Sequence, residues 1–205
     1  MAYQTINPAT GASVERFDSW DAAQREAALA QVSAATPAWA ATPLARRCEL
    51  LRALAGVLRE QQETLAQLVT LEMGKLINES RAEVEKCALG CEFYAEQAAR
   101  FLADELIETD AGKSLVAYQP LGTVLAVMPW NFPLWQVFRF IAPTLAAGNT
   151  GLLKHASNVP QCALAIERLV REAGFPEGVC RTLMIDARDV AGVIADERVQ
   201  AVTLT

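Results

Sequence analysis

The segment Pro129-Trp130-Asn131-Phe132-Pro133 could carry chemistry, because it sets a side-chain amide between two prolines directly after an apolar run. The amide of Asn131 can donate a hydrogen bond to an oxygen that gains negative charge, which is the task of an oxyanion hole. The run before it, Val124 to Met128, is continuously apolar, as expected of a strand covered on both faces. Pro129 removes a donor from the ladder, and Pro133 can occupy the first turn of a following helix. Asn131 is therefore predicted at the carboxyl end of a strand, where ligands bind in open α/β sheets.

A second polar segment, Lys154-His155-Ala156-Ser157, follows the next predicted strand, Thr150 to Lys154. Sheets of the Rossmann type commonly place an acidic residue here to bind the 2′-hydroxyl of an adenosine ribose. A lysine ammonium with no nearby carboxylate can instead tolerate or attract a 2′-phosphate. A solvated loop is the alternative for Lys154 and Ser157. His155, the one histidine, is interpreted as a loop residue rather than a catalytic base.

The chain resembles the aldehyde dehydrogenase superfamily, and most closely its succinate-semialdehyde dehydrogenase branch, in five segments taken in order. They are the two segments above together with Ile6-Asn7-Pro8-Ala9-Thr10-Gly11, Leu71-Glu72-Met73-Gly74-Lys75 and Leu145-Ala146-Ala147-Gly148-Asn149. A proline-bounded turn with a buried Trp is the alternative for residues 129–133 taken alone. The likeness extends over nearly the whole chain and implies the amino-terminal portion of such an enzyme.

The resemblance implies a cofactor, NADP or NAD, and the residues that hold it. Lys154 would bond ribose hydroxyls, and Ser157 would lie close to the 2′ position, where related NAD-selective members often carry Glu. NADP should therefore be accepted, alongside NAD. The cofactor-binding residues implied are Met128, Pro129, Trp130, Asn131, Lys154, His155, Ala156 and Ser157.

Arg139 is a cation inside an otherwise apolar predicted helix, which is costly unless water or a partner meets it. Trp135 lies four residues before it on the same helix face, and the rise from Asn131 to Arg139 is roughly 12 Å. A long side chain reaching back would leave room for a four-carbon chain. By resemblance, Trp135 and Arg139 bind the substrate, Arg139 through its distal carboxylate. The alternative is that Arg139 reaches solvent or pairs with an internal carboxylate.

The periodicity predicts an α/β fold, with a helical lead-in before a Rossmann-like parallel sheet. Helices are expected from a cap at Asp18 or Ser19 to about Ala35, from the Thr42-Pro43 pair through Val69 as one helix or two joined, and from about Glu79 to Leu106. Gly74 is expected to cap a helix, and Ser114 to Gln119 to form a strand. From Val124 onward, strands and helices alternate as in βαβ units. We divide the chain into a lead-in (1–113), an oligomerisation-type strand (114–122) and the first part of the NAD(P)-binding sheet (123–205).

Composition excludes several other classes. The 205 residues are 52% hydrophobic and carry a net charge of −6 without a basic block, which argues against a nucleic-acid surface. The apolar stretch from Gly122 to Gly148 is interrupted by prolines and polar residues and is too short to span a membrane. Five cysteines without a C-x-x-C, and no secretory signal, favour a reduced cytoplasm and no metal site. For Cys87 and Cys91, packing is favoured over a metal or redox pair.

Oxidation of an aldehyde to an acid needs a nucleophile, an oxyanion donor, a hydride acceptor and a base. Asn131 supplies only the donor. By resemblance, the catalytic cysteine, the glutamate base and a glycine-rich turn lie beyond Thr205, so the 205 residues alone are expected to be inactive. The resemblance implies a homodimer or homotetramer for the full-length enzyme. The alternative is a non-catalytic fragment that binds a nucleotide or a partner and has a bare sheet edge at its carboxyl end.

Overall fold

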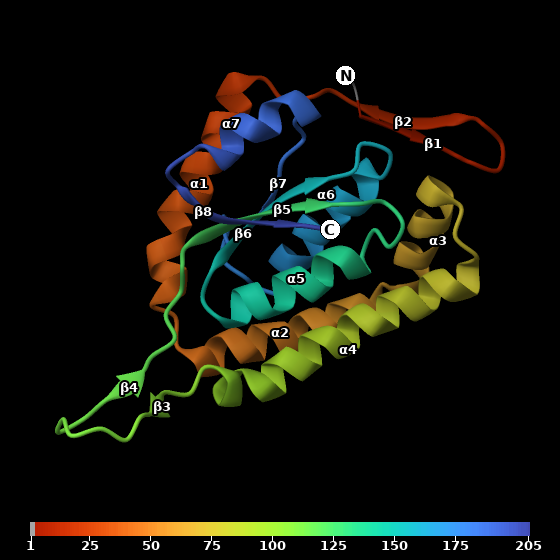
Figure 1. Ribbon diagram of the computed structural model, residues 1–205. Coiled ribbons are helices and arrows are strands. Elements are labelled where there is room, and N and C mark those ends of the chain that lie inside the picture. The colour runs from red at the N-terminus through yellow and green to blue at the C-terminus, as the bar shows by residue number, and fades with distance from the viewer. Residues whose placement is uncertain (1–2) are drawn as a thin grey trace.

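The computed structural model describes residues 3–205, and at its centre lies a parallel sheet with the strand order β7-β6-β5-β8 (Figure 1). The strands are β5 (Thr123–Met128), β6 (Thr150–His155), β7 (Cys180–Thr182) and β8 (Val199–Leu204). They are connected by α5 (Trp135–Ala146), α6 (Pro160–Glu172), and the turn η1 (Ala187–Asp189) with α7 (Val190–Ile194). The order reverses between β5 and β8, which in such sheets marks the ligand crevice. The predicted α/β class with a parallel sheet is confirmed.

Both faces of the sheet are buried, because successive strand residues point to opposite sides. Ala126 and Leu153 belong to the core under α5 and α6, whereas Leu125 and Leu152 belong to a second core under the first helix of the chain, Ala22–Ala40. This arrangement explains the continuously apolar strands. β8 lies at the edge of the sheet, with Leu204 77% exposed.

The lead-in begins with an antiparallel pair and continues as four helices (Figure 1). These elements are β1 (Tyr3–Ile6), β2 (Ser13–Phe17), α1 (Ala22–Ala40), α2 (Leu44–Glu60), α3 (Gln62–Met73) and α4 (Ile77–Phe101). The amphipathic stretch after Thr42 is therefore two joined helices, one of the two predicted forms. Gly74 ends α3 with φ +77°, and a Cβ there would lie 2.9 Å from Pro8 Cγ. The predicted cap at Gly74 is confirmed.

Several predicted helix ends are wrong by a few residues. Helix α1 begins after Asp21, not Asp18 or Ser19, because Asp21 and Gln24 form a reciprocal capping box. It also continues through Pro37 to Ala40. The hydroxyl of Thr42 donates to Ala38 O, 3.0 Å away, and so does not cap α2.

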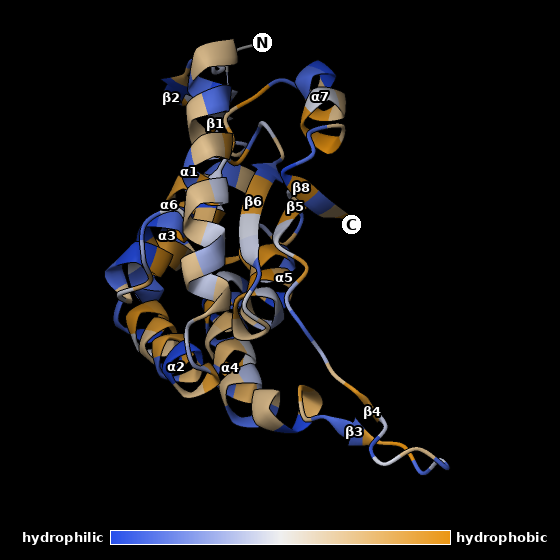
Figure 2. Ribbon diagram, turned by 90° about the vertical axis from the view of Figure 1, so that its left-hand side faces the viewer, coloured by the Kyte–Doolittle hydropathy of each residue, from blue (hydrophilic) through white to orange (hydrophobic). Residues whose placement is uncertain are grey.

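The segment between α4 and the sheet forms a small hairpin that projects from the body (Figures 1 and 2). Its strands are β3 (Glu105–Leu106) and β4 (Leu115–Val116), which pair antiparallel. Helix α4 therefore ends at Phe101 rather than Leu106, and the predicted strand from Ser114 to Gln119 is only two residues long. The chain bends at residues 110–112, between the two strands. Leu106 is 76% exposed, so the hairpin presents apolar surface.

Two buried carboxylates cap the helices that follow β5 and β6. Helix α5 has no side-chain cap of its own, and Glu83 Oε1 accepts hydrogen bonds from the backbone N–H groups of Leu134 (2.9 Å) and Trp135 (3.0 Å). Helix α6 is capped in the same way: Glu72 accepts from the N–H groups of Gln161 (3.0 Å) and Cys162 (2.8 Å). Glu83 also forms a buried ion pair with Lys75 of the segment that follows α3. The starts of α5 and α6 are thus fixed by α4 and α3. Since α5 begins only at Trp135, Pro133 lies before the helix rather than in its first turn.

His155 is the last residue of β6 and is buried, which corrects its interpretation as a loop residue. Its Nδ1 accepts from the N–H of Ala156 at 2.8 Å, so its Nε2 donates to the carbonyl oxygen of Pro133, also at 2.8 Å. This pattern fixes the neutral tautomer with the proton on Nε2. Burial lowers the pKa of His155 from 6.5 to about 4. His155 is a structural link between β6 and the start of α5.

We predict that Glu72→Ala lowers the free energy of unfolding by about 2 to 4 kcal/mol, because two amides at the start of α6 lose their acceptor in a buried site. Urea unfolding of the purified protein measures the change. Glu63→Ala is the matched control on the same helix, since Glu63 is exposed and paired with Arg81. Equal effects of the two substitutions would contradict a capping role for Glu72.

His155 predicts a pH dependence of stability. The pKa of an unfolded histidine is 6.5, and burial lowers it to about 4, so the unfolded chain binds more protons between these values. The contribution of His155 to the free energy of unfolding is complete above pH 6.5. It falls by about 3 kcal/mol in total as the pH drops toward 4. Unfolding measured from pH 7 to 4 for wild type and His155→Asn tests this. A wild-type loss no steeper than that of the variant would exclude His155 as the source.

Candidate functional site

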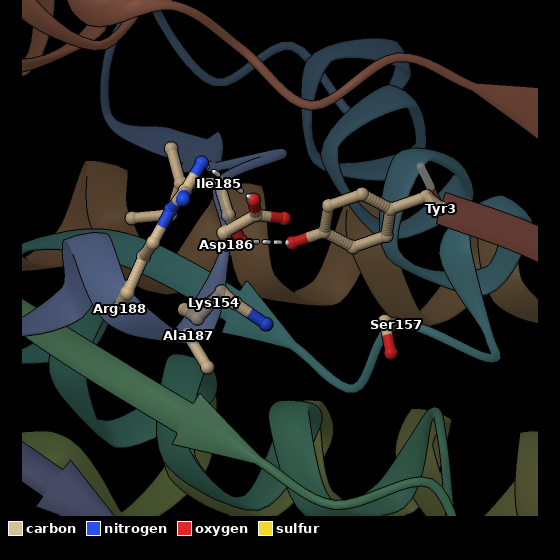
Figure 3. Close-up of a pocket in the computed structure, with 7 residues that line it drawn as sticks. All are labelled: Tyr3, Lys154, Ser157, Ile185, Asp186, Ala187 and Arg188. Atoms are coloured by element: carbon tan, nitrogen blue, oxygen red, sulfur yellow. Dashed lines mark hydrogen bonds and ion pairs between the residues drawn. The ribbon is translucent and has the colours of Figure 1, made fainter. Parts of the chain in front are cut away.

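A cavity of about 250 Å³ opens where β6 and β7 end (Figure 3). Two of the predicted cofactor-binding residues, Lys154 and Ser157, line it. The others do not line this cavity. The full lining is Tyr3, Lys154, Ser157, Ile185, Asp186, Ala187 and Arg188.

Lys154 is 8% exposed, and its ammonium lies in the wall of the cavity. Its Nζ donates to the carbonyl oxygen of His155 at 2.6 Å and lies 5.4 Å from the centre of the Tyr3 ring. Burial lowers the pKa of Lys154, and the charge of Asp186 acts against this by raising it. Lys154 therefore does have a carboxylate near it in space, although none is near it in sequence.

Tyr3, Asp186 and Arg188 complete the cavity, and the sequence did not single them out. The Tyr3 hydroxyl donates to the carbonyl oxygen of Ile185 at 2.6 Å, which ties β1 to the chain after β7. Burial raises the pKa of Tyr3 above its usual value, so the hydroxyl stays protonated. The sequence does hold a signal for Asp186, because it directly follows the apolar run Leu183-Met184-Ile185.

The segment from Pro129 to Pro133 follows the end of β5, which pairs with β6, the strand that carries Lys154. In the ladder, Met128 pairs with His155, so the two segments leave adjacent strands at the same level. Asn131 is exposed and lies just beyond the carboxyl end of β5, where it was predicted. The side chain of Met128 is 4% exposed in the core, so only its main chain faces the sheet end.

A buried lysine holds the loop that carries Asn131. Lys75 Nζ lies 3.7 Å from the centre of the Phe132 ring while it pairs with Glu83, which also caps α5. The loop is thus held at Phe132 and again at its last backbone amides. The sequence hints at an external acceptor for these amides, because Leu134 at the start of α5 has no side-chain acceptor of its own.

Trp135 and Arg139 lie on α5, one turn apart on the same helix face. Trp135 is half-buried, with Lys86 Nζ 4.3 Å from its ring centre. Arg139 is exposed, and no hydrogen bond or ion pair engages its guanidinium among residues 3–205. Of the two alternatives considered for Arg139, the structure shows the solvent-facing one rather than an internal ion pair.

The five cysteines are all buried free thiols, and burial raises the pKa of each. Such thiols are poor nucleophiles. Cys87 and Cys91 pack in the core beside α2. Within residues 3–205, no group of three or more metal-binding side chains is gathered, and no helix is both long and apolar enough to cross a membrane.

The cavity has the donors that a nucleotide ribose requires. Lys154 offers an ammonium from the last residues of β6, Ser157 offers a hydroxyl just beyond β6, and Asp186 offers an acceptor beyond β7. These groups fit a ribose, with or without a 2′-phosphate.

Known proteins share this architecture over the whole chain. The chain is 53% identical over 205 residues to a probable succinate-semialdehyde dehydrogenase (NADP(+)) of Synechocystis sp., of which it covers 45%. It is 48% identical over 208 residues to a succinate-semialdehyde dehydrogenase (NADP(+)) of Mycobacterium leprae and covers 46% of that protein. The chain thus spans a little under half the length of these relatives.

Among solved structures, succinic semialdehyde dehydrogenase from Streptococcus pyogenes in complex with NADP+ is similar, with a TM-score of 0.96 and 38% identity. That match covers 99% of this chain and 45% of that one. Succinate-semialdehyde dehydrogenase from Burkholderia pseudomallei has a TM-score of 0.94 and 29% identity, covering 100% of this chain and 43% of that one. The family model described as aldehyde dehydrogenase family matches residues 1–205. The chain belongs to the aldehyde dehydrogenase family.

Proposed function

We propose that this chain is the amino-terminal part of an enzyme that oxidises succinate semialdehyde to succinate with NADP or NAD. The observation that carries the proposal is Arg139, an exposed guanidinium without a protein partner on the helix that follows Asn131. Because no carboxylate among residues 3–205 pairs with this guanidinium, it is available to bind a carboxylate of the substrate. The named relatives and the cavity at Lys154 support the same reaction.

Asn131 would act on the aldehyde oxygen. When a nucleophile adds to the carbonyl, charge develops on that oxygen, and the exposed side-chain amide can donate to it. Lys75 and Glu83 fix the loop, so the amide is positioned before the reaction begins. Bound NAD(P) would supply the hydride acceptor. Because the five cysteines here are buried, we propose that the nucleophile and the base come from beyond Thr205.

Arg139 would select the substrate. It lies one helical turn beyond Trp135, a rise of roughly 6 Å, and its side chain can reach back toward the start of α5. A four-carbon chain with an aldehyde at one end and a carboxylate at the other would extend from Asn131 to the guanidinium. Trp135 lies on the same face between them and would contact the methylene groups.

We also propose that three segments of the chain have different roles. Residues 1–113 support the sheet, and residues 123–205 form the first part of the NAD(P)-binding unit. Residues 114–122 and the paired strand β3 would join subunits in a homodimer or homotetramer, since the projecting hairpin exposes Leu106, Val116 and Tyr118. The net charge of −6 fits a cytoplasmic enzyme that does not bind nucleic acid.

In the complete enzyme, Arg139→Leu should raise the Michaelis constant for succinate semialdehyde by roughly 30- to 500-fold, because a charge-assisted pair is lost. An uncharged aldehyde of similar length should be affected far less. Steady-state kinetics with both aldehydes measures the difference. Arg171→Leu, at another exposed arginine, is the control and should leave both constants unchanged. Equal losses for the two aldehydes would assign Arg139 to structure.

Ser157→Glu should lower the NADP/NAD ratio of kcat/KM roughly ten- to a hundredfold, because the new carboxylate would face the 2′-phosphate. Ser157→Ala, which removes the hydroxyl without adding charge, should lower the ratio only slightly. Kinetics with each cofactor at a fixed aldehyde concentration measures both variants. An unchanged ratio in Ser157→Glu would place Ser157 away from the ribose.

A further inference from the structure

Two charged residues beyond β7, Asp186 and Arg188, line the cavity, and the function proposed above gives neither of them a role in choosing between NAD and NADP. Figure 3 shows them on one side of the cavity, near Lys154, with their side chains directed toward each other. Arg188 Nη2 lies 3.4 Å from Asp186 Oδ2. Among residues 3–205, the cavity wall thus carries one carboxylate and two cations.

The two partners of this ion pair differ in how firmly the protein holds them. The Asp186 side chain is only 15% exposed, and the Ser19 hydroxyl donates to its Oδ1 at 2.8 Å. The Arg188 side chain is 83% exposed. An ion pair with so exposed a member stabilises the fold little, so the guanidinium can leave the carboxylate at small cost. Asp186 is a fixed acceptor, and Arg188 is a movable donor.

A ribose makes opposite demands on these groups according to its 2′ substituent. A 2′-hydroxyl can donate a hydrogen bond to a carboxylate, whereas a 2′-phosphate has no proton to offer it and is repelled. A guanidinium favours the phosphate, because it can pair with two of its oxygens. Lys154 can serve either ligand and so discriminates less.

We propose that Asp186 and Arg188 set the choice between NAD and NADP in this cavity. Asp186 accepts a hydrogen bond from the ribose hydroxyl of NAD and opposes the 2′-phosphate of NADP. Arg188 leaves Asp186 to pair with that phosphate when it is present. The inference rests on the nucleotide binding in the proposed function and is independent of the aldehyde chemistry. Since the pair contains one group of each sign, both nucleotides are accepted.

The test is equilibrium binding of NAD and of NADP to the full-length protein without aldehyde, measured by calorimetry. Arg188→Gln should weaken NADP binding roughly tenfold and change NAD binding less than about twofold. Asp186→Asn should tighten NADP binding roughly three- to tenfold and weaken NAD binding, because the repulsion and the charged acceptor are both removed. At high salt, the effect of Arg188→Gln on NADP should shrink.

A matched pair of controls exists on α2, where Arg46 and Glu49 form an exposed ion pair with a separation of 3.0 Å. Arg46→Gln and Glu49→Gln make the same charge changes far from the cavity and should alter neither affinity. Arg188 is so exposed that Arg188→Gln tests the inference even if Asp186→Asn unfolds. Parallel losses for NAD and NADP, an unchanged affinity ratio, or binding of neither nucleotide by wild type would overturn it. If wild type binds both nucleotides and the ratio shifts as stated while succinate semialdehyde is not oxidised, the inference stands and the proposed reaction fails.

Discussion

The site depends on two buried carboxylates that bind the backbone amides of helices they do not belong to. Neither α5 nor α6 brings a capping side chain, because Leu134 and Val159 occupy the cap positions. Glu83 and Glu72 supply the acceptors from α4 and α3. An uncapped, buried helix start would leave several donors without partners. The long helical lead-in therefore fixes where the two segments after β5 and β6 stand, in addition to covering one face of the sheet.

These caps also decide which groups can meet a phosphate. The first amides of a helix are a common anion site, because their N–H groups and the helix dipole favour negative charge. Here the protein's own carboxylates occupy the amides that begin α5 and α6. The cations that line the cavity are instead the side chains of Lys154 and Arg188. Recognition then depends on side chains that single substitutions can change, rather than on backbone geometry.

The sequence predicted the sheet and the positions of its helices because apolar periodicity reports burial directly. It predicted less well where helices start, since Asp18, Ser19 and Asp21 can all cap, and only the reciprocal bond with Gln24 selects Asp21. Contacts between segments far apart in the chain could not be predicted, because they leave no local pattern in the sequence. The ring of Tyr3 lies near Lys154 because β1 packs against α6 and the Tyr3 hydroxyl bonds the Ile185 carbonyl, which periodicity does not report. The cavity could therefore be predicted for Lys154 and Ser157 and only in part for Asp186.

At the end of β6, neighbouring residues point to opposite faces of the sheet, so that one packs in the core and the next lines the cavity. Leu152 and Leu153 point to opposite faces, toward the two different cores. Continuing the alternation, Lys154 points with Leu152 to the face that carries Tyr3, whereas His155 points with Leu153 toward α5. His155 accordingly bonds Pro133, and Lys154 lines the cavity. Any part that His155 takes in binding a cofactor is left to its main chain, whose carbonyl oxygen already accepts from Lys154. A histidine beside the lysine of the cavity thus fixes the loop that carries Asn131, and the segments 129–133 and 154–157 leave adjacent strands at one level.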